Sequence, residues 1–393
     1  MPQLSTRVSH FTDSVIRRMT RISDAAGAIN LSQGFPDFDP PKEILDALEK
    51  VAHEGPHQYA VTFGAPEFRE ALVRKHEMFS GLAYDPDSEV VVTCGGTEAM
   101  MCAMMAVCNP DDRAVVFSPF YENYTADAIL SGAEPIYVPL VPPDFHMDEA
   151  ALREAFKQRP KAIVVCNPSN PCGKVFTREE LMLIAQLAKE SDCFVITDEV
   201  YEHIVFSPHQ HVHFAALPGM RERTLTCSSL SKTYSITGWR LGYLLGPAEV
   251  IDAARKVHDF LTVGAAAPLQ QAALSGLNFG KDYYENLQAV YTKKREHFLK
   301  GLDAIGLAHN DPQGSYFVLV DISGILKHEM FKGMDDLAFC EWMTREIGVA
   351  AVPGSSFFKE GGGQYIRLHF AREEATLAEA LKRLSALSAY AGR

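Results

Sequence analysis

The sequence predicts an α/β protein whose central strands run parallel. From Glu89 onward, short apolar runs alternate with segments of helical periodicity, as in chains that build parallel sheets. One of these runs, residues 162–166, is apolar throughout, which is typical of a strand buried on both faces. A chain of 393 residues is also too long for one small core, so we expect two domains.

Composition argues against nucleic acid or a membrane as a partner. The formal net charge is −13, which disfavours binding to phosphate backbones and to anionic lipid surfaces. Hydrophobic residues make up 47% of the chain, as in ordinary globular proteins. The longest wholly apolar run, residues 99–108, has ten residues, about half of what a bilayer-spanning helix needs.

Cysteine usage indicates a reducing compartment. The eight cysteines occur without a CxxC pair, and the N-terminus has no apolar core of signal-peptide type. We therefore expect free thiols in the cytoplasm rather than a disulfide framework or a zinc site. His209, His211 and His213 alternate like metal ligands, but turn signals at residues 207–208 and 218–219 flank them. An exposed loop is the expected structure there, and we assign no metal.

The first 29 residues predict a polar arm followed by an amphipathic helix. Apolar residues recur there at nearly helical spacing, at Val15, Ile16, Met19 and Ile22. Residues 30–38 follow, and their Gly and Pro content disfavours regular structure, so we expect a loop.

Residues that could contact a ligand follow two of the predicted strands. After the strand at residues 90–93, Gly95-Gly96-Thr97 opens a helix and exposes backbone N–H groups at its N-terminus, which is a general anion site. Tyr121 follows the strand at residues 114–118. It could stack on a planar ring, or it could begin a helix as a surface aromatic.

Asp198 comes directly after the buried run at residues 194–197. A carboxylate at such a position is costly unless it is paired. A pyridine nitrogen would pair with it and stay protonated, and the protonated ring is a strong electron sink. A buried ion pair or a helix cap is the alternative interpretation.

Lys232 lies in a Ser-rich loop between two strand-like runs, within residues 224–246. Burial removes the charge of a lysine unless a partner or a covalent bond takes over. A desolvated lysine amine can attack a carbonyl and form a Schiff base. Ser229 and Arg240 offer a hydroxyl and a guanidinium that suit a phosphate. This combination indicates pyridoxal phosphate, an aldehyde that carries a phosphate.

The C-terminal part has a second candidate cation. In residues 365–371, strict alternation places Ile366 and Leu368 on one face and Arg367 on the other. We therefore expect Arg367 to point out of the core, free to bind a carboxylate through two parallel N–H hydrogen bonds. Further elements are expected at residues 269–302 (helix), 316–320 and 349–352 (strands) and 373–390 (helix).

Several of these motifs together resemble the fold-type-I, class I/II aminotransferases. Residues 229–232, Ser-Leu-Ser-Lys, with Gly238 and Arg240 at the same spacing, are similar to the lysine motif of that family. Residues 167–173 are similar to its Asn-Pro-x-Asn-Pro-Thr-Gly motif, with Cys172 where threonine is usual. The loop at residues 30–38 resembles that of the kynurenine and methionine aminotransferases. Six motifs in the family's order argue against coincidence.

The resemblance implies the type I fold of pyridoxal-phosphate-dependent transferases. Residues 46–285 would form a large cofactor-binding domain with a mostly parallel, seven-stranded-type sheet between helices. Residues 286–393 would form a small α+β domain, and residues 1–45 an N-terminal arm and part of the small domain. The family is also homodimeric with composite active sites, in which Tyr59 would reach the partner's cofactor phosphate.

The resemblance assigns catalytic roles to Lys232, Asp198 and Tyr201. Lys232 would hold the cofactor as a Schiff base and move the substrate proton, Asp198 would pair with the ring nitrogen, and Tyr201 would bind the phenolic oxygen. Residues expected at the cofactor are Tyr59, Gly96, Thr97, Tyr121, Asn170, Asp198, Tyr201, Ser229, Lys232 and Arg240. Residues expected at the substrate are Ile16, Gly34, Asn170 and Arg367.

The implied reaction is a ping-pong transfer of an amino group from an α-amino acid to a 2-oxo acid. Two segments carry the cation for a distal carboxylate in aspartate-specific relatives, and here neither residues 99–108 nor residues 257–268 contain Lys or Arg. A buried unpaired carboxylate is prohibitive, so we expect neutral, apolar or aromatic substrates. The alternatives are a broad aspartate aminotransferase that uses another cation, such as Arg7 or a partner residue, and a C–S β-lyase.

Two more distant functions compete. Ser229-x-x-Lys232 also matches the SxxK motif of acyl-serine enzymes, and residues 121–123 resemble their second motif. That motif precedes SxxK here, however, and no Lys-Thr-Gly follows. A cofactor-binding regulator built on the same fold would normally carry a basic DNA-binding module, for which no residues are left.

Overall fold

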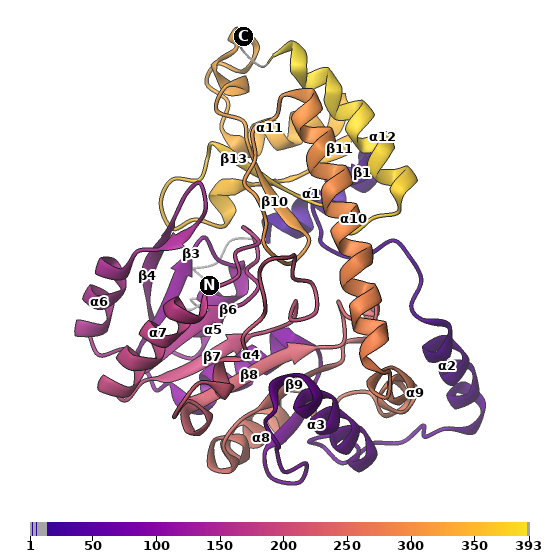
Figure 1. Ribbon diagram of the computed structural model, residues 1–393, viewed down its shortest axis with the longest axis vertical. Coiled ribbons are helices and arrows are strands. Elements are labelled where there is room, and N and C mark those ends of the chain that lie inside the picture. Colours follow the sequence, from indigo (N-terminus) through magenta and orange to yellow (C-terminus); the bar gives the residue numbers. More distant parts are fainter. Residues whose placement is uncertain (1, 3–4, 6–13, 391–393) are drawn as a thin grey trace.

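The computed structural model describes residues 2, 5 and 14–390 (Figure 1). Within these residues the chain forms a large sheet covered by helices and a smaller sheet that lies above it in Figure 1. Arg7, named above as an alternative cation, lies outside the described residues.

The large sheet has eight strands in the order β2-β9-β8-β7-β6-β3-β4-β5. The five strands from β8 to β4 run parallel, whereas β9 is antiparallel to both of its neighbours and β5 is antiparallel to β4. This parallel centre confirms the predicted fold class, and the two-residue β5 extends the predicted seven strands at one edge. The strands are β2 (Val90–Thr93), β3 (Arg113–Ser118), β4 (Glu134–Val141), β5 (His146–Met147), β6 (Ala162–Cys166), β7 (Phe194–Asp198), β8 (Thr224–Ser229) and β9 (Gly242–Leu245).

Helices cover both faces of this sheet because successive strand residues point to opposite sides. On β6, Val164 packs in one apolar cluster with helices α4, α5 and α8, and Ile163 packs in another with α6 and α7. Helices α2, α3 and α9 form a further apolar cluster with Val90 and Val92 of β2 and with Tyr243 and Leu245 of β9. The helices are α2 (Lys42–Glu54), α3 (Pro66–Ser80), α4 (Gly96–Val107), α5 (Glu122–Leu130), α6 (Glu149–Lys157), α7 (Arg178–Glu190), α8 (Ala248–Thr262) and α9 (Ala267–Leu277).

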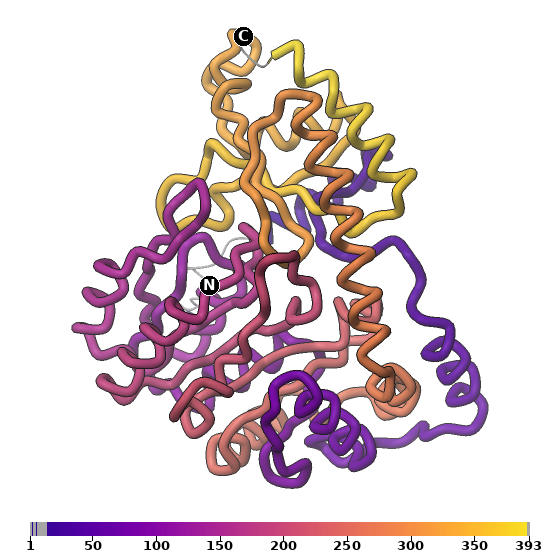
Figure 2. The backbone as a smooth tube through the Cα atoms, in the orientation of Figure 1, coloured from indigo at the N-terminus to yellow at the C-terminus, as the bar shows by residue number. Residues whose placement is uncertain are grey.

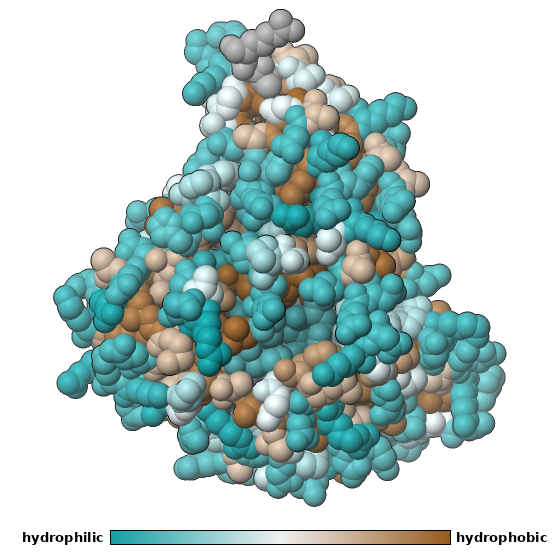
Figure 3. Space-filling view, in the orientation of Figure 1, coloured by the Kyte–Doolittle hydropathy of each residue, from teal (hydrophilic) through white to brown (hydrophobic). Residues whose placement is uncertain are grey.

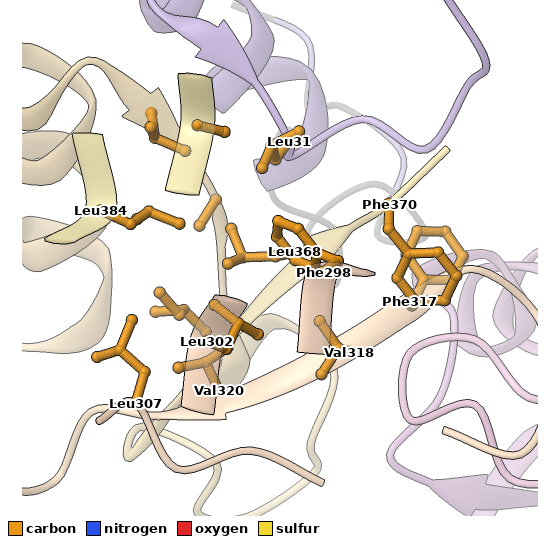
Figure 4. Packing of buried hydrophobic residues seen from close by; sticks show 14 of the residues in the cluster. Leu31, Phe298, Leu302, Leu307, Phe317, Val318, Val320, Leu368, Phe370 and Leu384 are labelled. Carbon is orange, nitrogen blue, oxygen red and sulfur yellow. The ribbon is translucent and has the colours of Figure 1, made fainter. Parts of the chain in front are cut away.

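The smaller sheet is antiparallel, in the order β10-β13-β12, and a separate parallel pair joins β1 to β11. One apolar core holds this part together, with Leu31 from the N-terminal segment among its members (Figure 4). Figure 2 shows the indigo N-terminal chain beside the yellow C-terminal chain. The elements are α1 (Val15–Ala26), β1 (Ile29–Asn30), α10 (Lys281–Ile305), β10 (Phe317–Asp321), α11 (Asp336–Trp342), β11 (Val349–Ala350), β12 (Val352–Pro353), β13 (Tyr365–His369) and α12 (Glu374–Leu384).

Three predicted elements differ from the structure. The single helix predicted at residues 269–302 is broken between α9 and α10, where Gly280 caps the start of α10. The strand predicted at residues 349–352 is split between β11 and β12, which belong to different sheets. The last helix ends at Leu384 and continues as a short 3-10 turn. The predicted domain boundaries at residues 45 and 285 remain predictions.

Charged and polar side chains dominate the face seen in Figure 3, with apolar side chains scattered between them. Among the residues that the structure describes, no helix is both long enough and apolar enough to cross a bilayer.

Candidate active site

A cavity of about 480 Å³ lies at the carboxyl ends of the parallel strands, next to the smaller sheet. Residues from β7, β8, α1, α4 and β13 line it together, although they are far apart in the sequence. Twelve of the residues predicted from the sequence lie in its wall: Ile16, Gly34, Gly96, Thr97, Tyr121, Asn170, Asp198, Tyr201, Ser229, Lys232, Arg240 and Arg367.

Lys232 lies just after β8, and its amine points at the loop of residues 30–38. Its Nζ donates a hydrogen bond to the Gly34 carbonyl oxygen at 2.9 Å, and the Tyr316 hydroxyl donates to the same oxygen at 2.8 Å. Burial lowers the pKa of Lys232 to about 8, and the nearby charges of Arg240 and Arg367 add to this effect. About half of the amine is therefore unprotonated near pH 8 and available as a nucleophile or a base.

An anion cradle lies beside Lys232 at the start of α4. Gly95 caps this helix without a side-chain hydrogen bond, so the first backbone N–H groups are available to a ligand. A Cβ at Gly95 would lie 2.2 Å from Arg240 Nη2, which explains why glycine is needed where the guanidinium approaches the helix end. The Ser229 hydroxyl and the Arg240 guanidinium complete a set of donors that suits a phosphate.

Asp198 ends β7 and faces the same cavity. Its Oδ2 accepts a hydrogen bond from the Tyr124 hydroxyl at 2.7 Å, and its Oδ1 accepts one from the Val200 amide at 3.2 Å. Burial raises the pKa of Asp198 above its ordinary value. None of the described residues forms an ion pair with it, so a cationic ligand group would stabilise the ionised carboxylate.

Arg367 lies on β13 and faces away from the core of the smaller sheet, as predicted, but it is not free. Its guanidinium lies between the rings of Phe317 and Phe357, 4.2 and 4.6 Å from their centroids. Its Nη1 donates to Asn170 Oδ1 at 2.7 Å and its Nη2 donates to the Ser32 carbonyl at 2.6 Å. Alternation separates the two faces of a strand but does not show what covers each face, so it did not predict these partners. The role of Arg367 in binding a carboxylate stays a prediction.

The charge of Arg367 nevertheless suits a carboxylate. Burial lowers the pKa of its guanidinium to about 10, so it stays protonated at neutral pH. Its Nε is buried without a hydrogen-bond partner among residues 14–390. A carboxylate in the cavity would supply an acceptor and a counter-charge.

Comparisons with known proteins agree with this geometry. A model of the family described as aminotransferase class I and II matches residues 26–384. The chain belongs to this family of aminotransferases. It is 35% identical to a probable N-succinyldiaminopimelate aminotransferase of Mycobacterium tuberculosis, over 98% of each chain. It is 36% identical to the methionine aminotransferase of Escherichia coli, over 98% of this chain and 97% of the relative.

A solved structure supports the same assignment. The N-succinyldiaminopimelate aminotransferase of M. tuberculosis superimposes with a TM-score of 0.93, over 98% of this chain and 100% of that one. This chain is therefore a transaminase of fold type I that depends on pyridoxal 5′-phosphate. The acyl-serine and regulator alternatives are not favoured by any of these relatives.

The cavity of the aminotransferase fits this cofactor. The cradle of Gly96, Thr97, Ser229 and Arg240 could hold the phosphate, and the depressed pKa of Lys232 suits bonding to the aldehyde carbon. The carboxylate of Asp198, which lacks a cation, could pair with the ring nitrogen. Further contacts could come from Asn170 and Tyr201 at the phenolic oxygen and from Tyr121 at the ring face.

Two sequence predictions near the cavity have different outcomes. Ile16 is buried in one apolar cluster with Phe357 and Tyr121 and lines the cavity, and its role in substrate binding stays a prediction. Tyr59 is not among the residues that line the cavity of its own chain, and 89% of it is exposed. Its role across a dimer stays a prediction.

Sequence reasoning missed several residues of the wall. Tyr124, which donates to Asp198, lies three residues after Tyr121 in the first turn of α5, so helical spacing could have placed it beside Tyr121. Arg17 directly follows Ile16, but the side that it faces depends on how α1 packs. The other lining residues that were not predicted are Ser14, Gln33, Phe35, Glu122, Val200, Ser231, Thr237, Gly238 and Phe317.

The histidine segment behind β7 also differs from its prediction. His211 Nε2 and His213 Nδ1 lie 3.1 and 2.7 Å from Glu199 Oε2, and both side chains are buried rather than exposed. Lys75 of α3 forms an ion pair with Glu202 in the same cluster. Turn residues flank the segment as expected, but the carboxylates that pair with its histidines come from elsewhere in the chain.

This cluster supplies its own positive charge. The ligand atoms of Glu199, Glu202, His211 and His213 lie within 4.8 Å of one another. Burial lowers the pKa of His213, but the charges of Glu199 and Glu202 outweigh that effect and raise it above the ordinary value. The charge of Lys75, together with that of His213 when it is protonated, therefore offsets the two carboxylates.

Proposed function

We propose that Lys232, Asp198 and Arg367 carry transamination in a cytoplasmic homodimer whose preferred amino acids are neutral, apolar or aromatic. The observation that supports this most directly is the shared cavity, in which the Lys232 amine, with a pKa near 8, lies together with Asp198 and Arg367. All eight cysteines lie within residues 14–390 and are free thiols, which supports the cytoplasm.

The bound cofactor supplies an electron sink for the bond that breaks at the substrate's α-carbon. Arg367, held by Asn170 and stacked between two phenyl rings, binds the α-carboxylate and fixes the substrate's orientation. Lys232 Nζ would take the proton from the substrate's α-carbon and later give it up again, acting first as base and then as acid. The carboxylate of Asp198 would pair with the ring nitrogen of the cofactor and would favour its protonated form.

The apolar part of the cavity supports the proposed substrates. Ile16, Phe35, Val200 and Phe317 line it. Helix α4 offers no cation there, since it contains neither Lys nor Arg. Relatives named for methionine and for kynurenine share this family. A higher kcat/KM for aspartate than for phenylalanine and methionine would contradict the substrate preference while leaving the lysine chemistry intact.

Lys232 is tested by covalent labelling. Borohydride reduction of the holoenzyme should fix the cofactor to the peptide that contains Lys232, and Lys232→Ala should abolish turnover. Lys256→Ala, which removes an exposed lysine paired with Asp252, is the matched control and should leave activity unchanged. A label on another peptide, or normal turnover of Lys232→Ala, would refute the central role.

The homodimer is supported by two exposed apolar segments that lie side by side. Phe260 is 92% exposed and Tyr59 is 89% exposed, with Leu261 and Val263 also exposed nearby in sequence. The two segments meet where Gly264 packs against Thr62. Exposed apolar surface of this kind is typical of an interface, and we propose that a second copy covers it and receives Tyr59.

Light scattering tests this assembly. The wild type should have twice the chain mass of 43.4 kDa. Phe260→Asp should shift it toward monomer and lower activity with it. Met330→Asp, at an apolar residue that is 48% exposed, is the control and should stay dimeric. A fully active wild-type monomer would refute the composite site.

A further inference from the structure

Among the described residues, three arginines line the cavity, and the mechanism uses two of them. Arg240 belongs to the phosphate cradle and Arg367 binds the α-carboxylate, whereas Arg17 has no assigned role. Arg17 lies in the first turn of α1, directly after Ile16, which closes the apolar wall. A cation at this place bears on the substrate preference, because the sequence offered none at the two usual positions.

The packing of α1 directs Arg17 to the mouth of the cavity. Ser14 caps the helix and its hydroxyl donates to the Glu122 carboxylate, which ties the first turn of α1 to α5. Ile16 and Met19 are buried, so the helix has a fixed orientation. Tyr121 also lines the cavity, and burial raises its pKa. The positive charges of Arg367 and Arg17 both oppose this rise.

The Arg17 side chain is uncommitted in this structure. It is exposed, and none of the described residues accepts a hydrogen bond from it or forms an ion pair with it. Arg18, its neighbour, instead forms an ion pair with Glu341 of α11, away from the cavity. Within residues 14–390, the carboxylates that line the cavity are those of Asp198 and Glu122, and Glu122 accepts the Ser14 hydroxyl.

We propose that Arg17 binds the distal carboxylate of dicarboxylic substrates, so that one cavity serves both a neutral amino acid and a 2-oxo dicarboxylic acid. This proposal rests on the proposed function, in which Arg367 binds the α-carboxylate. In a ping-pong reaction the two substrates occupy the same cavity in turn. An exposed arginine can remain hydrated while a neutral side chain is bound against Ile16, whereas a buried cation would stay unpaired at high cost.

Two unreactive ligands isolate the distal charge. Glutarate and pentanoate have the same chain length, but only glutarate has a second carboxylate. Each can be titrated into the holoenzyme and followed by the absorbance of the bound cofactor. We expect the wild type to bind glutarate at least tenfold more tightly than pentanoate. Arg17→Met should weaken glutarate at least tenfold and change the Kd of pentanoate less than twofold.

Arg18→Met is the matched control, since it makes the same substitution one residue further along the helix and should leave both dissociation constants unchanged. A second readout is the single-turnover rate with 2-oxoglutarate, which should fall in Arg17→Met relative to that with 4-methyl-2-oxopentanoate. Equal losses for both ligands, or a glutarate Kd within twofold of the wild type, would overturn the assignment. Failure of the proposed function would appear differently, as no reaction of the wild type with any amino acid.

Discussion

Two consecutive carboxylates at the end of β7 have opposite environments. Asp198 faces the cavity on the side of α4 and α5, and Glu199 faces the buried cluster behind the strand. Thr197 lies on the same side as Glu199, as period-two alternation requires, and donates to Glu199 Oε1 at 2.9 Å. Identical chemistry and adjacent positions thus lead to two different electrostatic outcomes.

The difference lies in the partners that the chain itself provides. His211 and His213 surround Glu199 and, although burial opposes it, hold the pKa of that carboxyl well below its usual range. Asp198 has one phenol and one amide, so burial dominates and its pKa is raised. A buried carboxylate that the fold has already paired contributes to structure, and one that the fold leaves without a cation is a candidate for binding a ligand.

The largest expected effect is on the cavity side. Asp198→Asn keeps the shape of the side chain but removes the charge that would hold the ring nitrogen protonated. We expect turnover to fall roughly 10³-fold, since the site loses an electrostatic contact to the reacting system. The melting temperature should change little, because no protein cation loses a partner. Steady-state kinetics and thermal unfolding measure both quantities, and turnover within tenfold of the wild type would show that the carboxylate is structural.

Glu199→Gln should give the reverse pattern. Removing this charge leaves a buried histidine cation without its main counter-charge, so the free energy of unfolding should fall by roughly 3 kcal/mol. Activity per folded molecule should fall less than tenfold, since Glu199 does not face the cavity. Urea denaturation followed by circular dichroism provides the first number. An unchanged denaturation midpoint would mean that the cluster contributes nothing to stability.

The pH dependence of stability sharpens the comparison further. The pKa of His213 is raised in the folded protein, so its contribution is fully present below the ordinary value of 6.5 and is lost as pH rises through the raised value. Wild-type stability should therefore decline over that interval. The decline should be smaller in His213→Gln, where only His258 among the described histidines, whose pKa the Glu98 carboxylate also raises, keeps such a contribution. We expect a smaller loss than for Glu199→Gln, because Lys75 still offsets one carboxylate. Parallel slopes for the two proteins in denaturation at several pH values would contradict this.

The sequence predicts the Asp198 side of this comparison but not the Glu199 side. Continuous apolar runs predicted the parallel sheet, and the residues that follow them predicted Asp198, because strand ends in such a sheet converge. The partners of Glu199 could not be found in this way. His211 and His213 lie in a loop with turn signals at both ends, and the buried environment depends on contacts with α3 that no local pattern contains.

The same limit explains two features near the cavity that the sequence did not show. Alternation on β13 identified Arg367 but not the phenyl rings that bury it. Helical spacing in α1 predicted that Ile16 is buried, but not that its neighbour Arg17 lines the cavity. Local patterns give the direction of a side chain relative to its own element. What lies in that direction depends on tertiary packing.

The smallest expected effect concerns the hydrogen bond that Asp198 does have. Tyr124→Phe removes the phenol that donates to Asp198 Oδ2. A hydrogen bond to a charged acceptor is worth about 1.5 kcal/mol or more, so we expect turnover to fall about tenfold. Because this bond lowers the pKa of Asp198, its loss should move the acid limb of the kcat/KM profile to higher pH. Tyr84→Phe is the control on the Glu199 side, since the buried Tyr84 hydroxyl has no hydrogen-bond partner among residues 14–390. If both variants shifted the acid limb equally, the effect would not come from the contact with Asp198, and the two carboxylates would be less independent than their geometry indicates.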